Sequence, residues 1–176
     1  DGPKTAKDND SVTAVRNYLK NIQGFKTVTV IKRSDNWGLA NSIINGITSI
    51  LGNHDKVIVL EDDIITSPNF LSFMNRALDK YANDVRVWYI SGWNYPIDPL
   101  GLGDAFFWRV MNCWGWATWA SRWKHFEKDP QRLIKTWHKE KINRFNLGGT
   151  HDFWPQVTAN YSGKKNTWAI FWYATI

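Results

Sequence analysis

The sequence has a single cysteine, Cys113, so no disulfide can form within the chain. A secreted disulfide scaffold is therefore excluded. There is no apolar stretch of the roughly 20 residues that a membrane-spanning helix requires. The four histidines show no zinc-like spacing. Basic residues are scattered and form no runs, and this argues against nucleic-acid binding.

The composition is that of one globular domain. The chain of 176 residues is long enough to bury a core, and its hydrophobic content of 43% is ordinary. A formal net charge of +6 indicates mild attraction to an anionic small molecule or to a membrane surface.

Tryptophan is present in excess, with twelve residues. Core packing explains any single tryptophan best, but aromatic side chains also form platforms on which sugar rings stack. Trp93 and Trp116 stand beside predicted turns, and we expect these two to line an acceptor site rather than the core. Five of the twelve lie within sixteen residues: Trp108, Trp114, Trp116, Trp119 and Trp123.

The stretch 56–60 is rich in β-branched residues and predicts a strand buried on both faces. Three carboxylates follow it directly: Glu61, Asp62 and Asp63. Because side chains alternate along a strand, Glu61 and Asp63 are expected on one face and Asp62 on the other. A helix is predicted next, with Ser67 as its N-cap and Pro68 in its first turn.

Adjacent carboxylates repel one another, so a positive charge is expected to compensate them. Oxygen ligands without a thiolate or imidazole suit a hard cation such as Mg²⁺ or Mn²⁺. The alternative is an acidic turn without a metal, whose carboxylates only interact favourably with the positive end of the dipole of the following helix.

Helices and strands alternate through the first half, which predicts an α/β sandwich with a mostly parallel sheet. The predicted helices are 10–22, 39–51, 68–82, 118–126 and 130–141, with one more after residue 152. The predicted strands are 26–32, 56–60, 85–90 and 106–109.

Several motifs occur in an order that resembles glycosyltransferases of the GT-A fold, in particular bacterial sugar transferases related to the N-acetylglucosaminyltransferase I family. Each motif is weak alone, and the ordered set covers most of the chain. The matching segments are 60–64 (LEDDI), 67–70 (SPNF), 91–94 (SGWN), 114–119 (WGWATW) and 151–154 (HDFW).

This resemblance implies a three-layer α/β/α sandwich and a metal-dependent, inverting hexosyl- or N-acetylhexosaminyltransferase of glycan biosynthesis. The implied partners are a nucleotide-diphospho-sugar donor and a glycan or glycolipid acceptor. By the same likeness Asp63 ligates Mn²⁺ or Mg²⁺, Glu61 and Asp62 contact the donor, and Asp1 contacts the nucleotide base. The single cysteine and the bacterial likeness favour the cytoplasm, with attachment at the inner membrane surface as an alternative.

Asp152 falls where the family carries its catalytic base. A carboxylate there takes the acceptor's proton as the hydroxyl oxygen attacks the anomeric carbon. The alternative from the residues alone is a helix N-cap, because Asp152 stands at the start of a predicted helix.

The likeness also divides the single domain into a nucleotide-sugar and metal half, 1–95, and an acceptor half, 96–176. Both ends look truncated against the family, and the apolar run 169–173 is expected to leave an exposed strand edge. These 176 residues are therefore expected to form part of a longer transferase, with an incomplete sheet, weak nucleotide binding and a tendency to self-associate.

Three alternatives remain open. A glycoside hydrolase would use two carboxylates about 5–9.5 Å apart and no metal. A non-catalytic carbohydrate- or partner-binding module would use the tryptophan-rich half. A nucleotidyltransferase is weaker, since the chain has no glycine-rich phosphate loop.

Overall fold

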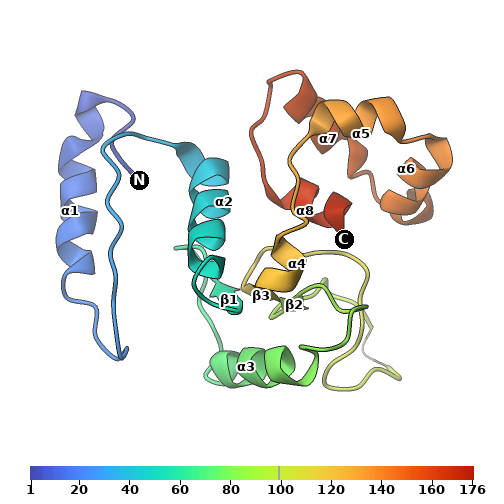
Figure 1. Ribbon diagram of the computed structural model, residues 1–176, viewed down its shortest axis with the longest axis horizontal. Coiled ribbons are helices and arrows are strands. Elements are labelled where there is room, and N and C mark those ends of the chain that lie inside the picture. The colour runs from blue at the N-terminus through green and yellow to red at the C-terminus, as the bar shows by residue number, and fades with distance from the viewer. Residues whose placement is uncertain (99) are drawn as a thin grey trace. The chain divides into compact units, whose positions relative to one another are not determined.

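The computed structural model describes residues 1–98 and 100–176, which divide into two compact units, 1–44 and 45–176 (Figure 1). In the described residues the helices are η1 (Ala6–Asp8), α1 (Asn9–Leu19), α2 (Gly38–Leu51), α3 (Phe70–Lys80), α4 (Ala120–Trp123), α5 (Pro130–Thr136), α6 (Lys139–Phe145), η2 (Leu147–Gly149), α7 (Trp154–Tyr161) and α8 (Ala169–Thr175). The strands are β1 (Lys56–Val59), β2 (Ile90–Ser91) and β3 (Trp116–Trp119).

The first unit contains η1, α1 and the first part of α2. The helices predicted over 10–22 and 39–51 are confirmed in position by α1 and α2. The strand predicted over 26–32 is wrong, because this segment pairs with no other strand, and Val28 and Val30 are 43% and 37% exposed. Alternating β-branched residues favour an extended backbone, but a strand also needs a hydrogen-bonding partner.

The second unit is built around a small sheet whose strand order is β1-β3-β2. Both pairings are antiparallel, with Val59 opposite Trp116 and Ile90 opposite Ala117. The predicted GT-A sandwich with a mostly parallel sheet is therefore wrong. The strand predicted over 56–60 is confirmed as β1, but its predicted burial on both faces is wrong: it is an edge strand in which only Val59 is buried.

The central strand β3 is the reason for the error. Its residues were interpreted as the end of a turn and the start of a helix over 118–126, yet Trp116–Trp119 form the strand that pairs with both others. Of the predicted strand 85–90 only the last residue is in β2, and 106–109 forms no strand. A helix begins only at Ala120 and ends at Trp123.

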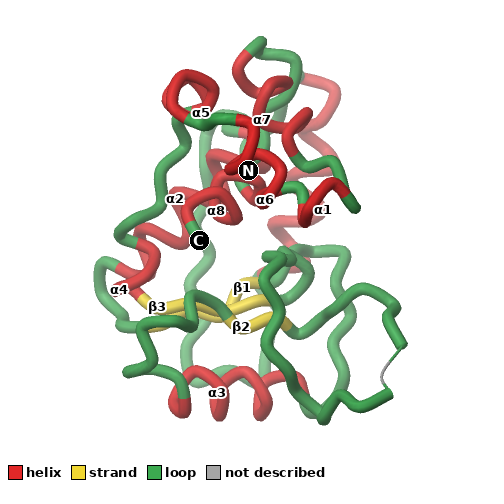
Figure 2. The backbone as a smooth tube through the Cα atoms, turned by 90° about the vertical axis from the view of Figure 1, so that its right-hand side faces the viewer, coloured by secondary structure: helices red, strands yellow, loops and turns green. Residues whose placement is uncertain are grey.

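Helices cover both faces of the sheet (Figure 2). On one face lies α3, which buries Phe70, Met74 and Leu78 at helical spacing against Ile90 and Ala117. The predicted helix 68–82 is thus confirmed. It begins two residues late because Asn69, and not Ser67, is the N-cap.

The opposite face carries the tryptophan core, which we define as Trp116, Trp123, Phe126, Trp168 and Trp172. Trp116 from β3 stacks on Trp168 at a centroid distance of 5.3 Å, and Trp172 lies 5.0 Å from Trp123. Trp116 and Trp172 are both 0% exposed. Alternation along β3 sends Trp116 to this side and Ala117 to α3.

The apolar run 169–173 belongs to this core. It forms most of α8, and its members from Ile170 to Tyr173 are all at most 8% exposed. The expectation of an exposed strand edge at 169–173 is therefore wrong, because the run is helical and the rest of the second unit covers it.

The remaining C-terminal helices are short. The helix predicted over 130–141 is two helices, because Trp137 has an extended backbone and His138 N-caps α6 by accepting from the Lys141 N–H. The side chain of Asp129 caps α5 by accepting from the Arg132 N–H at 2.8 Å. None of the helices within 1–98 and 100–176 has both the length and the apolar character needed to cross a membrane.

Arg122 ties α4 to the loop that follows α3. Its guanidinium donates to the carbonyls of Ala82 at 3.2 Å and Asp84 at 3.0 Å, and to that of Val87 at 3.3 Å. Arg122 is 9% exposed and lies over the Trp119 ring at 5.4 Å. Three backbone acceptors and an aromatic face thus satisfy a buried cation.

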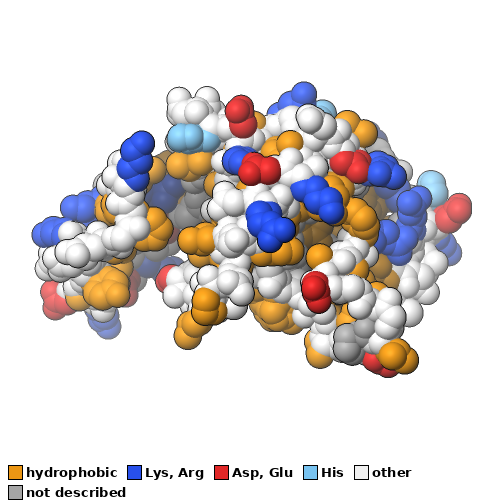
Figure 3. Space-filling model, turned by 90° about the horizontal axis from the view of Figure 1, so that it is seen from below, with side chains coloured by type: hydrophobic (Ala, Val, Ile, Leu, Met, Phe, Trp, Pro, Cys, Tyr) orange, Lys and Arg blue, Asp and Glu red, His pale blue; other side chains and the backbone are white. Residues whose placement is uncertain are grey.

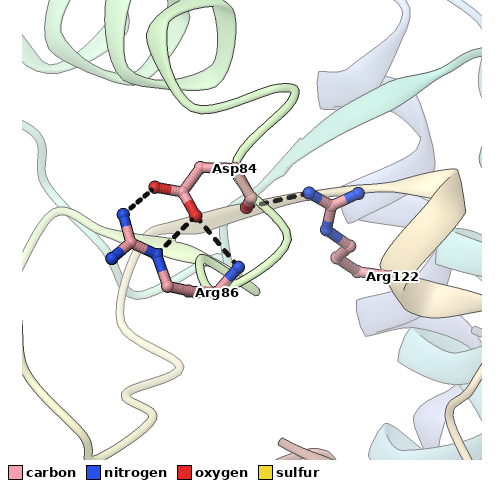
Figure 4. A network of polar contacts seen from close by, with 3 residues as sticks. All are labelled: Asp84, Arg86 and Arg122. Atoms are coloured by element: carbon pink, nitrogen blue, oxygen red, sulfur yellow. Dashed lines mark hydrogen bonds and ion pairs between the residues drawn. The ribbon is translucent and has the colours of Figure 1, made fainter.

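Beside it, Asp84 forms a two-pronged ion pair with Arg86 (Figure 4). Hydrogen bonds from the Arg86 side chain and from its backbone N–H lower the pKa of Asp84 to about 2. A carboxylate with a lowered pKa adds stability that is fully present above its unfolded pKa near ~3.9. That contribution is lost as the pH falls from about 4 through about 2.

Carbon-detected NMR is expected to show the Asp84 carboxyl titrating with a midpoint of about 2. In Arg86→Gln the midpoint should move up toward the ordinary aspartate value of about 3.9, because the charged partner is gone. Arg76→Gln, an exposed change on α3, serves as the control and should leave the midpoint in place. Equal midpoints in wild type and Arg86→Gln would contradict the assignment.

Candidate functional site

The acidic turn, which we define as Glu61, Asp62 and Asp63, follows directly after β1. Asp62 and Asp63 are exposed and Glu61 is half-buried. Burial raises the pKa of the Glu61 carboxyl, and the charges of Asp63 and Asp62 raise it further. Among the described residues no lysine or arginine forms an ion pair with these three carboxylates. None of the ion pairs of residues 1–98 and 100–176 involves the acidic turn.

Two glycines bring three other segments to this turn. The Gly92 N–H donates to the Gly115 carbonyl at 2.8 Å, so residues 91–94 lie beside 114–116. A Cβ at Gly92 would come within 2.5 Å of the Phe70 ring, and one at Gly115 within 3.0 Å of it. Gly115 also has φ +71°, and its Cβ position lies 3.4 Å from Leu60. Four of the segments singled out in the sequence therefore meet around Phe70, and both glycines are required there.

An aromatic group adjoins the acidic turn. Just beyond the last β1–β3 pair, Val59 with Trp116, the Cβ position of Gly115 lies 3.4 Å from the Leu60 side chain, so Glu61 and Trp114 stand on neighbouring segments. Trp114 is 50% exposed and meets Trp93 edge-to-face at 4.6 Å. Tyr95 lies 5.1 Å from Trp93 on the same segment. We call Trp93, Tyr95 and Trp114 the aromatic group.

A cleft of about 510 Å³ opens next to this group. It runs from α3 past residues 91–94 to 104–109, and Trp93 and Asn94 line it together with Phe106 and Trp108. Its volume is that of a small-molecule site, and its wall combines aromatic rings with a few polar groups. We call it the aromatic cleft.

Cys113 is a neighbour of the acidic turn that the sequence analysis missed. Burial raises the pKa of its thiol, and the charges of Glu61 and Asp63 raise it further. The proximity depends on the antiparallel β1–β3 pairing, since Cys113 lies fifty residues along the chain from Asp63. No local pattern in the sequence carried that information.

Trp116 lies elsewhere than expected. It is 0% exposed inside the tryptophan core, so the interpretation of Trp116 as one of the least core-like tryptophans is wrong. Trp93, by contrast, is half-buried and lines the aromatic cleft. Trp114, not singled out for this role, supplies the second exposed ring.

Asp152 is exposed and accepts a hydrogen bond from the Asn146 side-chain N–H at 2.9 Å. The other end of that amide accepts from the N–H groups of Phe153 at 3.0 Å and Trp154 at 3.1 Å, at the start of α7. Asp152 itself therefore does not cap α7: it orients Asn146, which does. In the described residues no hydrogen bond links Asp152 to the acidic turn.

Asp1 lies in the first unit, and its carboxylate accepts from the N–H groups of Trp37 and Gly38, each at 2.9 Å. These donors stand at the start of α2, where an anion balances unpaired N–H groups and the helix dipole. The contact of Asp1 with a nucleotide base stays a prediction.

The acidic turn suits a hard cation in donor chemistry, since it offers only carboxylate oxygens and lacks a counter-ion. In 1–98 and 100–176 no cluster of three or more His, Cys, Asp or Glu side chains is arranged to hold a metal ion. A cation at this turn would therefore need further oxygen ligands, such as the phosphate oxygens of a bound nucleotide.

Comparison with protein-family models, with curated proteins and with solved structures gave no match for this chain. The family resemblance and the activity it implies therefore remain predictions. The observations that bear on function are the acidic turn, the aromatic group and the aromatic cleft.

Proposed function

We propose that the second unit is the working part of a metal-dependent inverting glycosyltransferase, with the donor at the acidic turn and the acceptor in the aromatic cleft. The observation that carries this proposal is that the acidic turn and the aromatic cleft lie next to each other around Phe70. Carboxylates that form no ion pair within the described residues adjoin one exposed and one half-buried indole ring, so a charged donor and a sugar ring find matching chemistry side by side.

In this proposal Asp63 holds a Mn²⁺ or Mg²⁺ ion, and Glu61 and Asp62 contact the donor. When bound, the ion supplies Lewis-acid stabilisation of the charge that develops on the departing diphosphate. Trp93 positions the acceptor ring. Asp152 does not line the aromatic cleft, and its role comes from the family resemblance: it takes the proton of the acceptor hydroxyl as that oxygen attacks the anomeric carbon from the face opposite the leaving group.

Asp63→Asn is expected to abolish most of the thermal stabilisation that a nucleoside diphosphate and Mn²⁺ give together. A ligand at a hundredfold excess over its Kd stabilises the folded state by about 2.7 kcal/mol. For a chain of this length that corresponds to a rise in Tm of roughly 5–10 °C. The measurement is a thermal-shift screen of nucleoside diphosphates with Mn²⁺ and with EDTA.

Asp55→Asn is the matched control, because Asp55 is an exposed carboxylate at the other end of β1. It should keep the wild-type shift, and both variants should have the wild-type Tm without ligand. Nucleotide stabilisation of the same size in EDTA would reject the metal-dependent donor site.

The aromatic group also supports a second candidate, a carbohydrate-binding module without catalysis. Half-buried Trp93, exposed Trp114 and a cleft of about 510 Å³ suffice to hold a sugar ring. Binding of an oligosaccharide that survives Asp63→Asn and EDTA, with no turnover of any nucleotide sugar, would favour this candidate. Metal-independent release of free sugar from a glycoside would instead favour a hydrolase.

A further inference from the structure

A second cleft, of about 730 Å³, lies between α6 and the end of α8. We call it the basic cleft. None of the residues that line it belongs to the acidic turn or to the aromatic group. Three permanent cations line it against a single carboxylate, and its wall is aromatic. The side chains that the following paragraphs use are Arg109, Trp137, Glu140, Lys141, Arg144 and Tyr173.

The cations of the basic cleft have no carboxylate partner. Within the described part of the chain, Arg109, Lys141 and Arg144 take part in no ion pair. Lys141 holds its ammonium over the Trp137 ring at 4.3 Å, and Arg109 donates to the Arg144 carbonyl at 3.4 Å. Each contact places a cation at the cleft without neutralising it. Figure 3 shows one face of the molecule, on which Lys and Arg side chains stand among hydrophobic ones.

The wall behind these cations is rigid. The Tyr173 hydroxyl donates to the Phe145 carbonyl at 2.9 Å and is buried, so it locks α8 to the end of α6. The Phe145 ring stacks on Tyr173 at 4.6 Å and meets Trp137 edge-to-face at 5.3 Å. A site whose walls are held this way loses little conformational freedom when a ligand binds.

We propose that the basic cleft binds a phosphoryl group, carried either on a small molecule or on a lipid headgroup. Planar guanidinium groups match phosphate oxygens, and an ammonium adds a point charge. Three unpaired cations against one carboxylate favour a ligand with two or more negative charges. Arg109 and Ile176 line both the basic cleft and the aromatic cleft, but the phosphoryl site uses none of the residues assigned above to the metal, the donor or the acceptor.

The test is titration with inorganic pyrophosphate, with glucose 1-phosphate and with glucose, followed by isothermal calorimetry and by the side-chain NMR signals of the arginines and of Trp137. Both phosphates should bind and glucose should not. Arg144→Gln and Lys141→Gln should each weaken pyrophosphate binding roughly tenfold or more, because each removes a charge-assisted contact. Affinity should fall as salt rises.

Arg76→Gln is the matched control, because it removes the same charge from an exposed position on α3 outside the cleft. It should leave the affinity unchanged, and Tm values should show that all three variants fold. Sedimentation with vesicles of phosphatidylcholine alone or with phosphatidylglycerol separates the two sources of phosphate. The site is supported if the soluble phosphates or the phosphatidylglycerol vesicles bind and Arg144→Gln reduces that binding. Absence of binding in both arms, or equal losses in Arg76→Gln and Arg144→Gln, overturns it.

Discussion

Asp152→Asn is expected to lower the turnover of the proposed glycosyl transfer by about 10²–10⁴-fold. Asparagine cannot accept the proton of the acceptor hydroxyl. It keeps an oxygen, however, that can accept the hydrogen bond that Asn146 now donates to Asp152 at 2.9 Å. The variant therefore removes the base and preserves the cap of α7. Affinity for the donor and Tm should both stay near the wild-type values.

Asn146→Ala provides the converse variant. It removes the amide that accepts from Phe153 and Trp154 and should lower the free energy of unfolding by about 1 kcal/mol. Its turnover at a temperature well below Tm should fall far less than that of Asp152→Asn. The measurement is kcat from initial rates, with unfolding in urea for stability. Near-normal kcat in Asp152→Asn would reject Asp152 as the base and leave it only the role of positioning Asn146.

Trp116→Ala is expected to have the largest effect on stability, a loss of about 3–5 kcal/mol. The indole is 0% exposed and contacts Trp123, Trp168 and Trp172, so its removal leaves a cavity that β3 cannot close. β3 is also the central strand, and a shift of its backbone would disturb both pairings of the sheet.

Trp114→Ala is the matched control, two residues away on the same segment and 50% exposed. It should cost at most about 1.5 kcal/mol, because half of its surface is already in water. Urea unfolding followed by circular dichroism gives both values. A loss in Trp116→Ala no larger than in Trp114→Ala would contradict the burial of Trp116. Trp114→Ala should instead weaken sugar binding at the aromatic group.

The structure confirms one strand and three helices that local patterns predict. The run 56–60 is a strand followed by acids, and the helices of 10–22, 39–51 and 68–82 are present within a few residues. Phe70, Met74 and Leu78 recur at helical spacing and fill one side of the core. In each case the information lies within one turn or one strand of sequence.

Failures occurred where a residue's environment comes from a distant segment. Trp116–Trp119 became the central strand because β1 and β2 supply hydrogen-bonding partners on both sides, while the tryptophan core covers one face and the mostly aliphatic cluster around α3 covers the other. The segment 26–32 has a better strand pattern but has no paired neighbour. Strand formation depends on pairing between segments, and a single sequence does not state which segments pair.

The candidate site divides in the same way. The sequence by itself determined that three carboxylates end a strand, that Gly92 and Gly115 lie within tryptophan-containing segments, and that Asp152 precedes a helix. Only the tertiary structure decided that Trp116 is core while Trp114 is exposed, that Cys113 adjoins the acidic turn, and that Asn146 stands between Asp152 and α7. The physical reason is that burial and hydrogen-bond partners arise from contacts between residues far apart in the chain, which form only when the sheet pairs and the helices pack on it.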